Sequence, residues 1–455
     1  MPAAAGPRAA HALAATDREH EEAMYHLGNL LGLDTSNPPG NEAAAVRYVA
    51  GVLGAERVPF EVVEPVPGRA SLVARLSAHR PDEALLLSAH TDVVPADPAR
   101  WTHPPFGGRV ADGFAWGRGA LDMKHMLAQS LMAVLIANRR GLVLGRDLVL
   151  AAVADGEQGC ANGSLHLAAR RPDLLRARFC LTEAGGFNLR VGERVLVPVG
   201  VATKGFAWLR VTAKGEGGHG SMPDEESAVW RLMGALRRIE SGLVEQRLCG
   251  ASIDFMDAVA ACLPGARGLA VHALKVGSSS AFLRRVMPDR EQSRYFAAIT
   301  HDTAAVTILR AGSSENVIAD TAEAIVDLRV LPGRPVAQAV EALAARLGDD
   351  VDVTVIRSGA ATVSERRTPM WDLIEDAIGR ALPEARVAPW ILPGFSDAMA
   401  WSSLGITTYG FAPVLLPPGF SYSKLVHAAD ERVPVDGFRW GLDVLLDVVA
   451  GWCCR

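Results

Sequence analysis

Three short, continuously apolar runs limit the possible folds of this chain more than any other feature. They are ALLLSA (84–89), LVLAAVA (148–154) and FCLT (179–182). Such runs are typical of strands that are buried on both faces, and these strands occur in sheets covered by helices on both sides. A long helical stretch at about 123–138 separates the first two runs. The pattern therefore predicts an α/β fold with a buried, mixed sheet flanked by helices.

The pattern changes after about residue 202, and this change predicts a second unit. GFAWLRVTAKG and AAVTILRAG indicate strands, and an amphipathic helix is expected between them at 227–247. We expect an α+β domain at 203–313, inserted into a first domain that consists of 17–202 and 314–455. Residues 1–16 are expected to be a disordered tail.

Composition and charge exclude several functional classes. The chain has 455 residues, of which 49% are hydrophobic, so it can form two domains with their own cores. Its net charge of −5 argues against a nucleic acid or an anionic membrane as partner and favours a small molecule. None of the six cysteines lies in a CxxC pair, and the N-terminus lacks the apolar region of a signal peptide. A cytoplasmic location is therefore expected.

Five side chains near the ends of predicted elements have the chemistry of metal ligands. They are His90, Asp122, Glu157, Glu183 and His427. Glu157 and Glu183 each follow an apolar strand, so both should lie at the sheet edge where open α/β sheets bind ligands. Two imidazoles and three carboxylates suit a pair of divalent ions, with zinc favoured and cobalt or manganese as competitors.

Asp92 follows His90 at the spacing that puts both side chains on one face of an extended chain. Its carboxylate can orient the imidazole of a metal-binding histidine. Taken alone, this pair is equally typical of a polar strand end that leads into a surface loop.

The chain resembles the M20 family of metallopeptidases, which includes acetylornithine deacetylase, succinyl-diaminopimelate desuccinylase and aminoacylase-1. The resemblance extends from about residue 17 to the end of the chain. It rests on seven motifs in the family's order: SAHTDVVP, WGRGALDMK, ADGEQG, LTEAGG, GGHGSMP, ENVIADTAEAIVDLRVLPG and HAADERVP. It implies a catalytic domain with two divalent metal ions, an inserted lid, a homodimer formed through that lid, and a small-molecule amide or peptide as substrate.

The resemblance also assigns roles to individual residues. It implies that Asp92 supports His90, and that His219 reaches a catalytic site, often that of the partner subunit, to polarise the scissile carbonyl. Asn316 is a candidate substrate contact. The implied metal ligands form two sets that share one carboxylate: His90, Asp122 and Glu183 for one ion, and Asp122, Glu157 and His427 for the other.

The sequence departs from this family at the position of the general base. Family members usually have two successive glutamates where this chain has Gly156 and Glu157. With Glu157 kept as a ligand, the base is missing, which typically lowers the rate on the order of 10²–10⁴-fold. A Glu at position 156 is then expected to raise hydrolysis by about 10²-fold or more. A one-residue slip would instead make Glu157 the base and Gln158 a poor ligand.

A second departure affects the expected substrate pocket. The resemblance leads us to expect arginines near Met399 and Ser402, but the chain has none there. A pocket without them is less basic. Asp397 and Arg329 remain as candidate substrate contacts, and Arg329 is equally typical of a structural ion pair.

Three functional hypotheses remain. The first is an M20-type hydrolase of an N-acyl amino acid, a dipeptide or a related amide, with weakened or unusual base catalysis. The second keeps the fold and the metals but assigns a non-hydrolytic step in a specialised biosynthetic pathway. The third is a metal-binding pseudoenzyme, against which the retention of all five ligand types argues.

Overall fold

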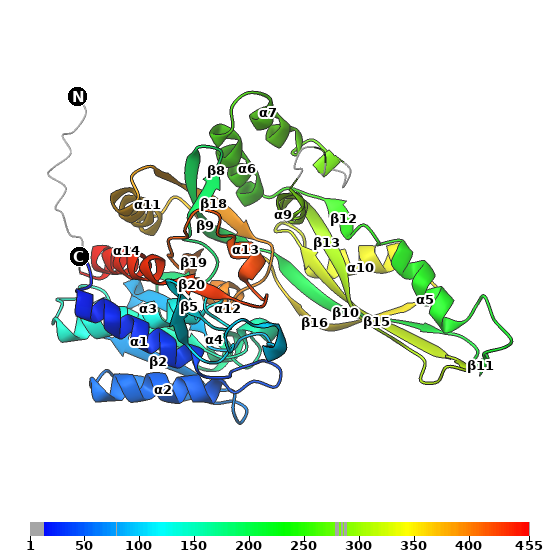
Figure 1. Cartoon of the computed structure of the whole chain (residues 1–455), viewed down its shortest axis with the longest axis horizontal. Coiled ribbons are helices and arrows are strands. Elements are labelled where there is room, and N and C mark those ends of the chain that lie inside the picture. The colour runs from blue at the N-terminus through cyan, green and yellow to red at the C-terminus, as the bar shows by residue number, and fades with distance from the viewer. Residues whose placement is uncertain (1–12, 79, 278–281, 284, 286–288, 455) are drawn as a thin grey trace.

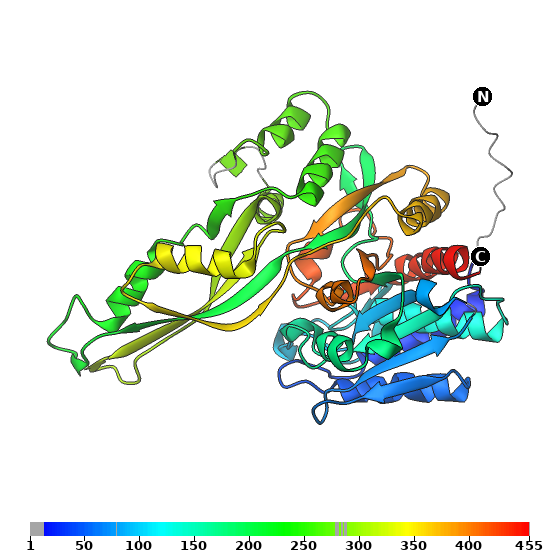
Figure 2. The same cartoon turned by 180° about the vertical axis from the view of Figure 1, so that it is seen from behind.

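Strands and helices alternate along the chain as the sequence pattern predicts. In the structure, a computed structural model, one large mixed sheet of ten strands has helices on both faces, and a smaller sheet of five strands projects from it (Figures 1 and 2). The predicted α/β class with an additional α+β unit is therefore confirmed. The structure describes residues 13–78, 80–277, 282–283, 285 and 289–454.

The large sheet places the three apolar runs side by side. Its order is β1-β2-β6-β3-β7-β19-β9-β17, and β8 and β18 also pair with β9. Strand β3 runs parallel to both β6 and β7, so the residues that follow these three strands meet at one edge. The bounds are β1 (Phe60–Val63), β2 (Ser71–Leu76), β3 (Leu85–His90), β6 (Leu148–Val153), β7 (Phe179–Thr182), β8 (Leu189–Val191), β9 (Arg194–Thr203), β17 (Thr362–Val363), β18 (Ala385–Leu392) and β19 (Thr407–Gly410).

Helices cover both faces of this sheet because successive strand residues point to opposite sides. In β3, Leu85 and Leu87 belong to the large core that contains α1, α3 and α14. Leu86 belongs to a separate cluster with Leu167 of α4 and Trp401 of α12. The bounds of the helices around the sheet are α1 (Asp17–Leu31), α2 (Glu42–Ala55), α3 (Lys124–Arg139), α4 (Ser164–Arg170), α11 (Pro369–Ala381), α12 (Ala398–Ser403), α13 (Tyr422–Leu425) and α14 (Val435–Cys453).

The predicted tail overlaps the start of the described chain. Residues 1–12 lie outside the described residues, and Thr16 caps α1 by accepting a hydrogen bond from the Glu19 N–H group. Among the residues that the structure describes, no helix is long and apolar enough to cross a membrane.

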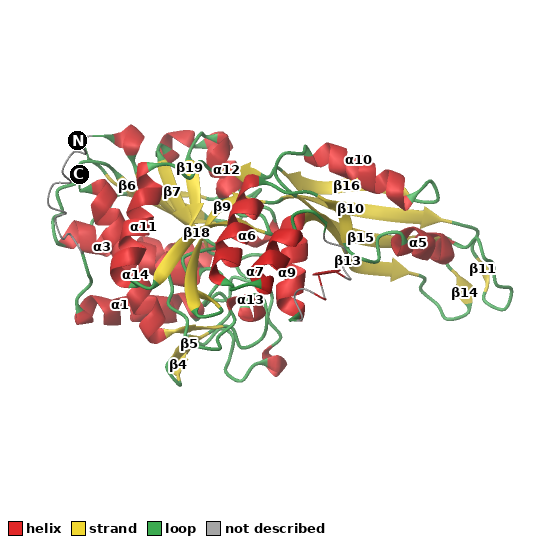
Figure 3. Ribbon diagram, turned by 90° about the horizontal axis from the view of Figure 1, so that it is seen from above, coloured by secondary structure: helices red, strands yellow, loops and turns green. Residues whose placement is uncertain are grey.

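The smaller sheet, with two helices on one face, forms an extended arm (Figure 3). Its strand order is β12-β13-β15-β10-β16, and α5 and α10 share one apolar cluster with β10 and β15. At the tip of the arm, β11 (Gly218–His219) pairs with β14 (Val317–Ile318) (Figure 1). The other bounds are β10 (Gly205–Lys214), α5 (Ala228–Arg237), β12 (Leu243–Gln246), β13 (His301–Ala311), β15 (Thr321–Val330), α10 (Val336–Leu347) and β16 (Asp352–Gly359).

Within the chain that the structure describes between β12 and β13, three helices connect the arm back to the large sheet. They are α6 (Gly250–Cys262), α7 (Ala266–Ala273) and α9 (Arg290–Thr300). Helix α6 packs against β18 and β9, and its buried Phe255 and Met256 belong to the main core. The sequence pattern shows only an irregular stretch here.

Two sequence-based boundaries differ from the structure. The helix expected at 227–247 ends at Arg237, because the chain turns at Gly242, with φ of 70°, into β12. The predicted inserted domain ends at 313, but β15 and β16 also belong to the arm sheet. The chain therefore returns to the large sheet at β17, near residue 362. The boundary is hidden in the sequence because β15 pairs with β10, which lies more than a hundred residues earlier. The division into two domains stays a prediction.

Candidate metal centre

The carboxyl edge of the parallel strands collects the five predicted metal ligands. His90 is the last residue of β3, Glu183 follows β7, and Glu157 follows β6 in the short 3₁₀ helix η3 (Gly156–Gln158). Asp122 precedes α3, and His427 follows α13. Five segments that are distant in the sequence thus supply one side chain each.

The five side chains form two sets that share Asp122. His90, Asp122 and Glu183 form one set, and Asp122, Glu157 and His427 form the other, with ligand atoms within 4.8 Å of one another in each. In the first, His90 Nε2 lies 3.1 Å from Asp122 Oδ1. In the second, His427 Nε2 lies 3.2 Å from both Asp122 Oδ2 and Glu157 Oε2. Each oxygen of Asp122 therefore faces a different set.

The charges of this cluster fit divalent cations. Burial raises the pKa of Glu183 to about 8, and the charge of Asp122 adds to this effect although His90 opposes it. Burial alone lowers the pKa of His427, but Asp122 and Glu157 outweigh it and raise the pKa to about 11. In the metal-free protein, protons on these groups therefore partly balance the carboxylates. Because metal ligands must lose their protons, metal binding here releases protons and is favoured by higher pH.

An unpartnered oxygen also fits a metal ion. Glu157 Oε1 is buried and has no hydrogen-bond partner among the residues that the structure describes. Buried polar atoms are rarely left unsatisfied, and a cation between Glu157, Asp122 and His427 satisfies this one. The slipped alignment, with Gln158 as ligand, is not the arrangement that the structure adopts, because Glu157 takes the place beside Asp122.

Asp92 joins His90 to the segment that contains Glu157. Its Oδ1 lies 3.4 Å from His90 Nδ1 and accepts the Gly156 N–H at 2.9 Å. Its Oδ2 accepts the Glu157 N–H at 3.0 Å and the amide of Asn37 at 2.8 Å. His90 Nδ1 also lies 3.0 Å from the backbone carbonyl oxygen of Asp92. Asp92 is fully buried, so its carbonyl group and its carboxylate can orient the imidazole together, and the carboxylate holds the backbone of Glu157.

Arg118 and Glu431 form a second support, which the sequence analysis missed. Glu431 accepts the backbone N–H groups of Leu121 and Asp122 at 2.7 and 3.1 Å, and Arg118 Nη1 at 2.6 Å. Arg118 Nη2 donates to the His427 carbonyl oxygen at 3.2 Å. This buried pair fixes two ligand segments at once. The acidic pair after His427 was the available signal, whereas the sequence holds no signal for Asn37.

Gly156 is in close contact with His90. A Cβ atom built on Gly156 would lie 2.5 Å from both Cβ and Cγ of His90. These atoms are close to the backbone of His90, so a side chain at position 156 requires either His90 or the backbone around Gly156 to shift. The expectation that a Glu at position 156 simply supplies a missing base therefore meets a steric obstacle.

Asp155 is also committed elsewhere. Its Oδ1 accepts Arg69 Nη2 at 2.7 Å and Asn37 at 3.1 Å, and its Oδ2 accepts the Asn162 N–H at 2.9 Å. A carboxylate held in this way is not available as a general base.

The other predicted site residues, His219, Asn316, Arg329 and Asp397, are not members of the two sets. His219 is exposed in β11 at the tip of the arm, where Gly220 N–H donates to the Asn316 carbonyl oxygen at 2.8 Å. Arg329 is paired with Asp327 at 2.8 Å. Asp397 is fully buried and bonded to Ser164, so it cannot contact a substrate directly in this conformation.

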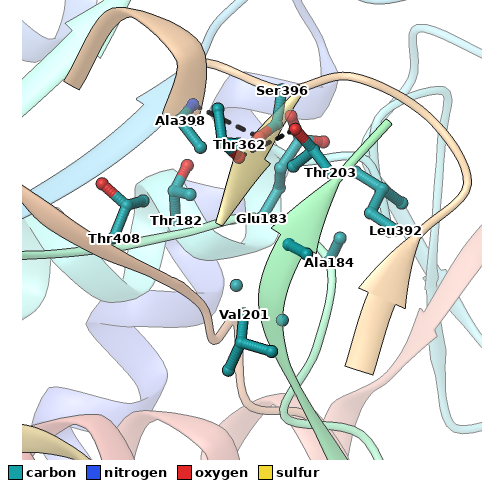
Figure 4. Close-up of a pocket in the computed structure, with 13 residues that line it drawn as sticks. Thr182, Glu183, Ala184, Val201, Thr203, Thr362, Leu392, Ser396, Ala398 and Thr408 are labelled. Carbon is teal, nitrogen blue, oxygen red and sulfur yellow. Dashed lines mark hydrogen bonds between the residues drawn. The ribbon is translucent and has the colours of Figure 1, made fainter. Parts of the chain in front are cut away.

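A small cavity lies beside Glu183, between the ends of β7, β9 and β17 (Figure 4). At its wall, the hydroxyl groups of Thr203 and Thr362 lie 2.9 Å apart and share a hydrogen bond. Its volume of about 10 Å³ is close to the minimum for a single water molecule. This cavity is too small for a substrate.

Comparison with known proteins gives one consistent result. The sequence model described as "Peptidase family M20/M25/M40" matches residues 86–451. Aminoacylase-1 of Sus scrofa is 26% identical, over 96% of this chain and 97% of the relative. The N-fatty-acyl-amino acid synthase/hydrolase PM20D1 of Xenopus tropicalis is 27% identical, over 76% of this chain and 68% of the relative. The M20 family metallo-carboxypeptidase Sso-CP2 of Sulfolobus solfataricus has a similar fold, with a TM-score of 0.71 and 17% sequence identity. The match covers 96% of this chain and 99% of that protein.

Loss of the Glu431 carboxylate is expected to weaken metal binding. Glu431→Gln removes a hydrogen-bonded charge beside Asp122, and such supporting contacts typically contribute 10–100-fold to metal affinity. Zinc affinity, measured by competition with a chromophoric chelator, should fall within that range. Asp436→Asn, an exposed carboxylate in the first turn of α14, is the matched control. Equal affinities in the two variants contradict the assigned role, and thermal unfolding of the metal-free proteins detects a folding defect.

A side chain at position 156 is expected to disturb the His90 set. Gly156→Ala adds only a methyl group, and Gly156→Glu adds a carboxylate, but both must shift either His90 or the backbone around Gly156. We expect both variants to bind less than the wild-type amount of zinc by elemental analysis. Gly51→Ala in α2, where an added Cβ meets no atom within 4 Å, is the control. If Gly156→Glu keeps its full zinc content and hydrolyses an amide faster, this expectation is wrong. Position 156 is then simply the place of a missing general base.

Proposed function

Because this chain belongs to peptidase family M20, we propose that it is a two-metal amidase that acts on an N-acyl amino acid, a dipeptide or a related small amide. The observation that carries the proposal is the pair of ligand sets that share Asp122. Zinc is the proposed metal, because two imidazoles and three carboxylates at this spacing suit it. The names of the relatives support the amide class, since one is an N-fatty-acyl-amino acid synthase/hydrolase.

The chain's own residues have separate tasks in this proposal. One ion is held by His90, Asp122 and Glu183, and the other by Asp122, Glu157 and His427. Bound divalent cations supply Lewis-acid chemistry, which polarises an amide carbonyl and makes water more acidic. Asp92 keeps the His90 imidazole oriented. The short contact between Gly156 and His90 leaves no room for a carboxylate at position 156.

Base catalysis is therefore the weak part of the proposed hydrolysis. Position 156 has no side chain, and the Asp155 carboxylate is held by Arg69 and Asn37. Without a positioned base we expect turnover on the order of 10²–10⁴-fold lower than that of a site that has one.

A second candidate is a metal-dependent step that does not consume water. The packing of His90 against Gly156 favours it, because the absence of a carboxylate is built into the geometry of a ligand. In that reaction the site binds and polarises an amide or a carbonyl group without activating water.

We further propose a homodimer formed through the arm. Strand β12 pairs with β13 only at residues 301–303, so residues 304–311 of β13 lie at the edge of the arm sheet. Val306, Ile308 and Leu309 are exposed there, and an apolar, unpaired edge favours pairing with another chain. Strand β11, which contains His219, lies at the tip of the arm, away from the large sheet (Figure 1), and the Gly220 N–H that follows it donates to the Asn316 carbonyl oxygen. Both residues are therefore proposed to act in the partner's site.

A substrate screen tests the proposed reaction. Zinc-loaded protein is incubated with N-acyl amino acids and dipeptides, and the products are identified by mass spectrometry. Slow release of a free amino acid, lost in Asp122→Ala and after chelation, is the expected result. If the accumulating product is not the acid and amine that amide hydrolysis releases, the step that does not consume water replaces hydrolysis as the proposed reaction. If no substrate is consumed while two zinc ions are bound, neither reaction holds.

Mixed dimers test the proposed role of His219 across the interface. His219→Ala and Asp122→Ala should each be inactive alone, because each lacks one half of a composite site. After mixing and subunit exchange, random pairing should restore roughly a quarter of the wild-type activity. No restoration, although light scattering shows dimers that exchange subunits, excludes a role in the partner's site.

A further inference from the structure

A cleft of about 420 Å³ is lined in part by His427, and none of the other proposed ligands lines it. Two loops form its walls: residues 95–101, which follow β3, and residues 427–429. Arg118 contributes from between them. The volume lies in the range of small-molecule sites, and the small cavity beside Glu183 does not. The position next to a proposed metal ligand makes this cleft a candidate for binding the part of a substrate that extends beyond the reacting bond.

The walls of the cleft are held together by specific contacts. Thr102 donates its N–H and its hydroxyl to the carboxylate of Asp430, at 2.7 and 2.9 Å. The guanidinium group of Arg118 lies 5.2 Å from the centre of the Trp101 ring and also donates to the His427 carbonyl oxygen. The cleft is therefore preformed, which lowers the entropic cost of binding a ligand.

Arg100 is the available cation in this cleft. It ends the short helix η2 (Pro98–Arg100) and is exposed. Among the residues that the structure describes, none forms a hydrogen bond or an ion pair with its guanidinium group. Arg118, by contrast, is paired with Glu431. Asp97 directs its Oδ1 to the Ala99 N–H at 3.1 Å, so it caps η2 and does not pair with Arg100.

We propose that this cleft binds the carboxylate end of the substrate, with Arg100 as the contact for the carboxylate and Trp101 beside the adjacent apolar part. A guanidinium group binds a carboxylate with two parallel hydrogen bonds, which gives both affinity and orientation. The inference rests on the proposed amidase function and specifies its substrate as one that carries a free carboxylate near the amide.

The test compares two ligands that differ only in this group. N-acetyl-L-phenylalanine and N-acetyl-L-phenylalaninamide are titrated into zinc-loaded protein, and their dissociation constants are measured. We expect the acid to bind about 10-fold more tightly than the amide, because a charged hydrogen bond is replaced by a neutral one. Arg100→Gln should remove this preference, and Arg100→Lys should retain part of it. Arg47→Gln, on the exposed side of α2, is the control and should keep it.

Kinetics give a second measurement for any acid that is turned over. Arg100→Gln should raise KM about 10-fold and leave kcat within about twofold, since the contact is made in the ground state and the transition state alike. A preference for the acid that survives Arg100→Gln, or equal binding of acid and amide to the wild type, overturns the inference and leaves the amidase proposal intact. If neither ligand binds and the substrate screen is also negative, the proposed function itself fails, and this inference fails with it.

Discussion

Three carboxylates that converge on one point cannot all stay ionised without positive charge between them, and this constraint organises the edge of the large sheet. Asp122, Glu157 and Glu183 are mostly buried there, and the pKa of Glu183 rises to about 8 as a consequence. His90 and His427 are the only imidazoles of the two ligand sets that balance them. The parallel strands β3, β6 and β7 matter mainly because they bring these charges together from distant parts of the chain.

The groups that support this cluster act largely on the backbone. Asp92 accepts the N–H groups of Gly156 and Glu157, and Glu431 accepts those of Leu121 and Asp122. Each buried carboxylate therefore fixes the chain at a predicted ligand, and the side chain of that residue is positioned by its own backbone. Rigid placement of this kind is favourable at a metal site, because errors of a few tenths of an ångström weaken coordination.

The sequence predicts the elements and ligands that depend on local patterns. The apolar runs indicate the strands. Because His90 ends one run and Glu157 and Glu183 follow the other two, the runs also indicate the sheet edge at which these side chains meet. Features that depend on distant contacts are hidden. The arm extends to Gly359 because β15 pairs with β10, and no local signal marks that pairing. The meaning of Gly156 changes for the same reason: its sequence position indicates a missing carboxylate, and only the fold reveals that His90 occupies the space.

Helix α6 gives the arm a third attachment to the large sheet, in addition to the two points where the backbone crosses. A unit joined by two strands alone can bend about them at little cost. Here, any swing of the arm must either carry α6 along, exposing Phe255 and Met256 to water, or deform the segment between β12 and α6 and the direct junction of α9 with β13. Exposing each of those side chains costs roughly 1.5–3 kcal/mol. The range over which the arm can move relative to the large sheet is therefore limited by an apolar contact as well as by the flexibility of its backbone.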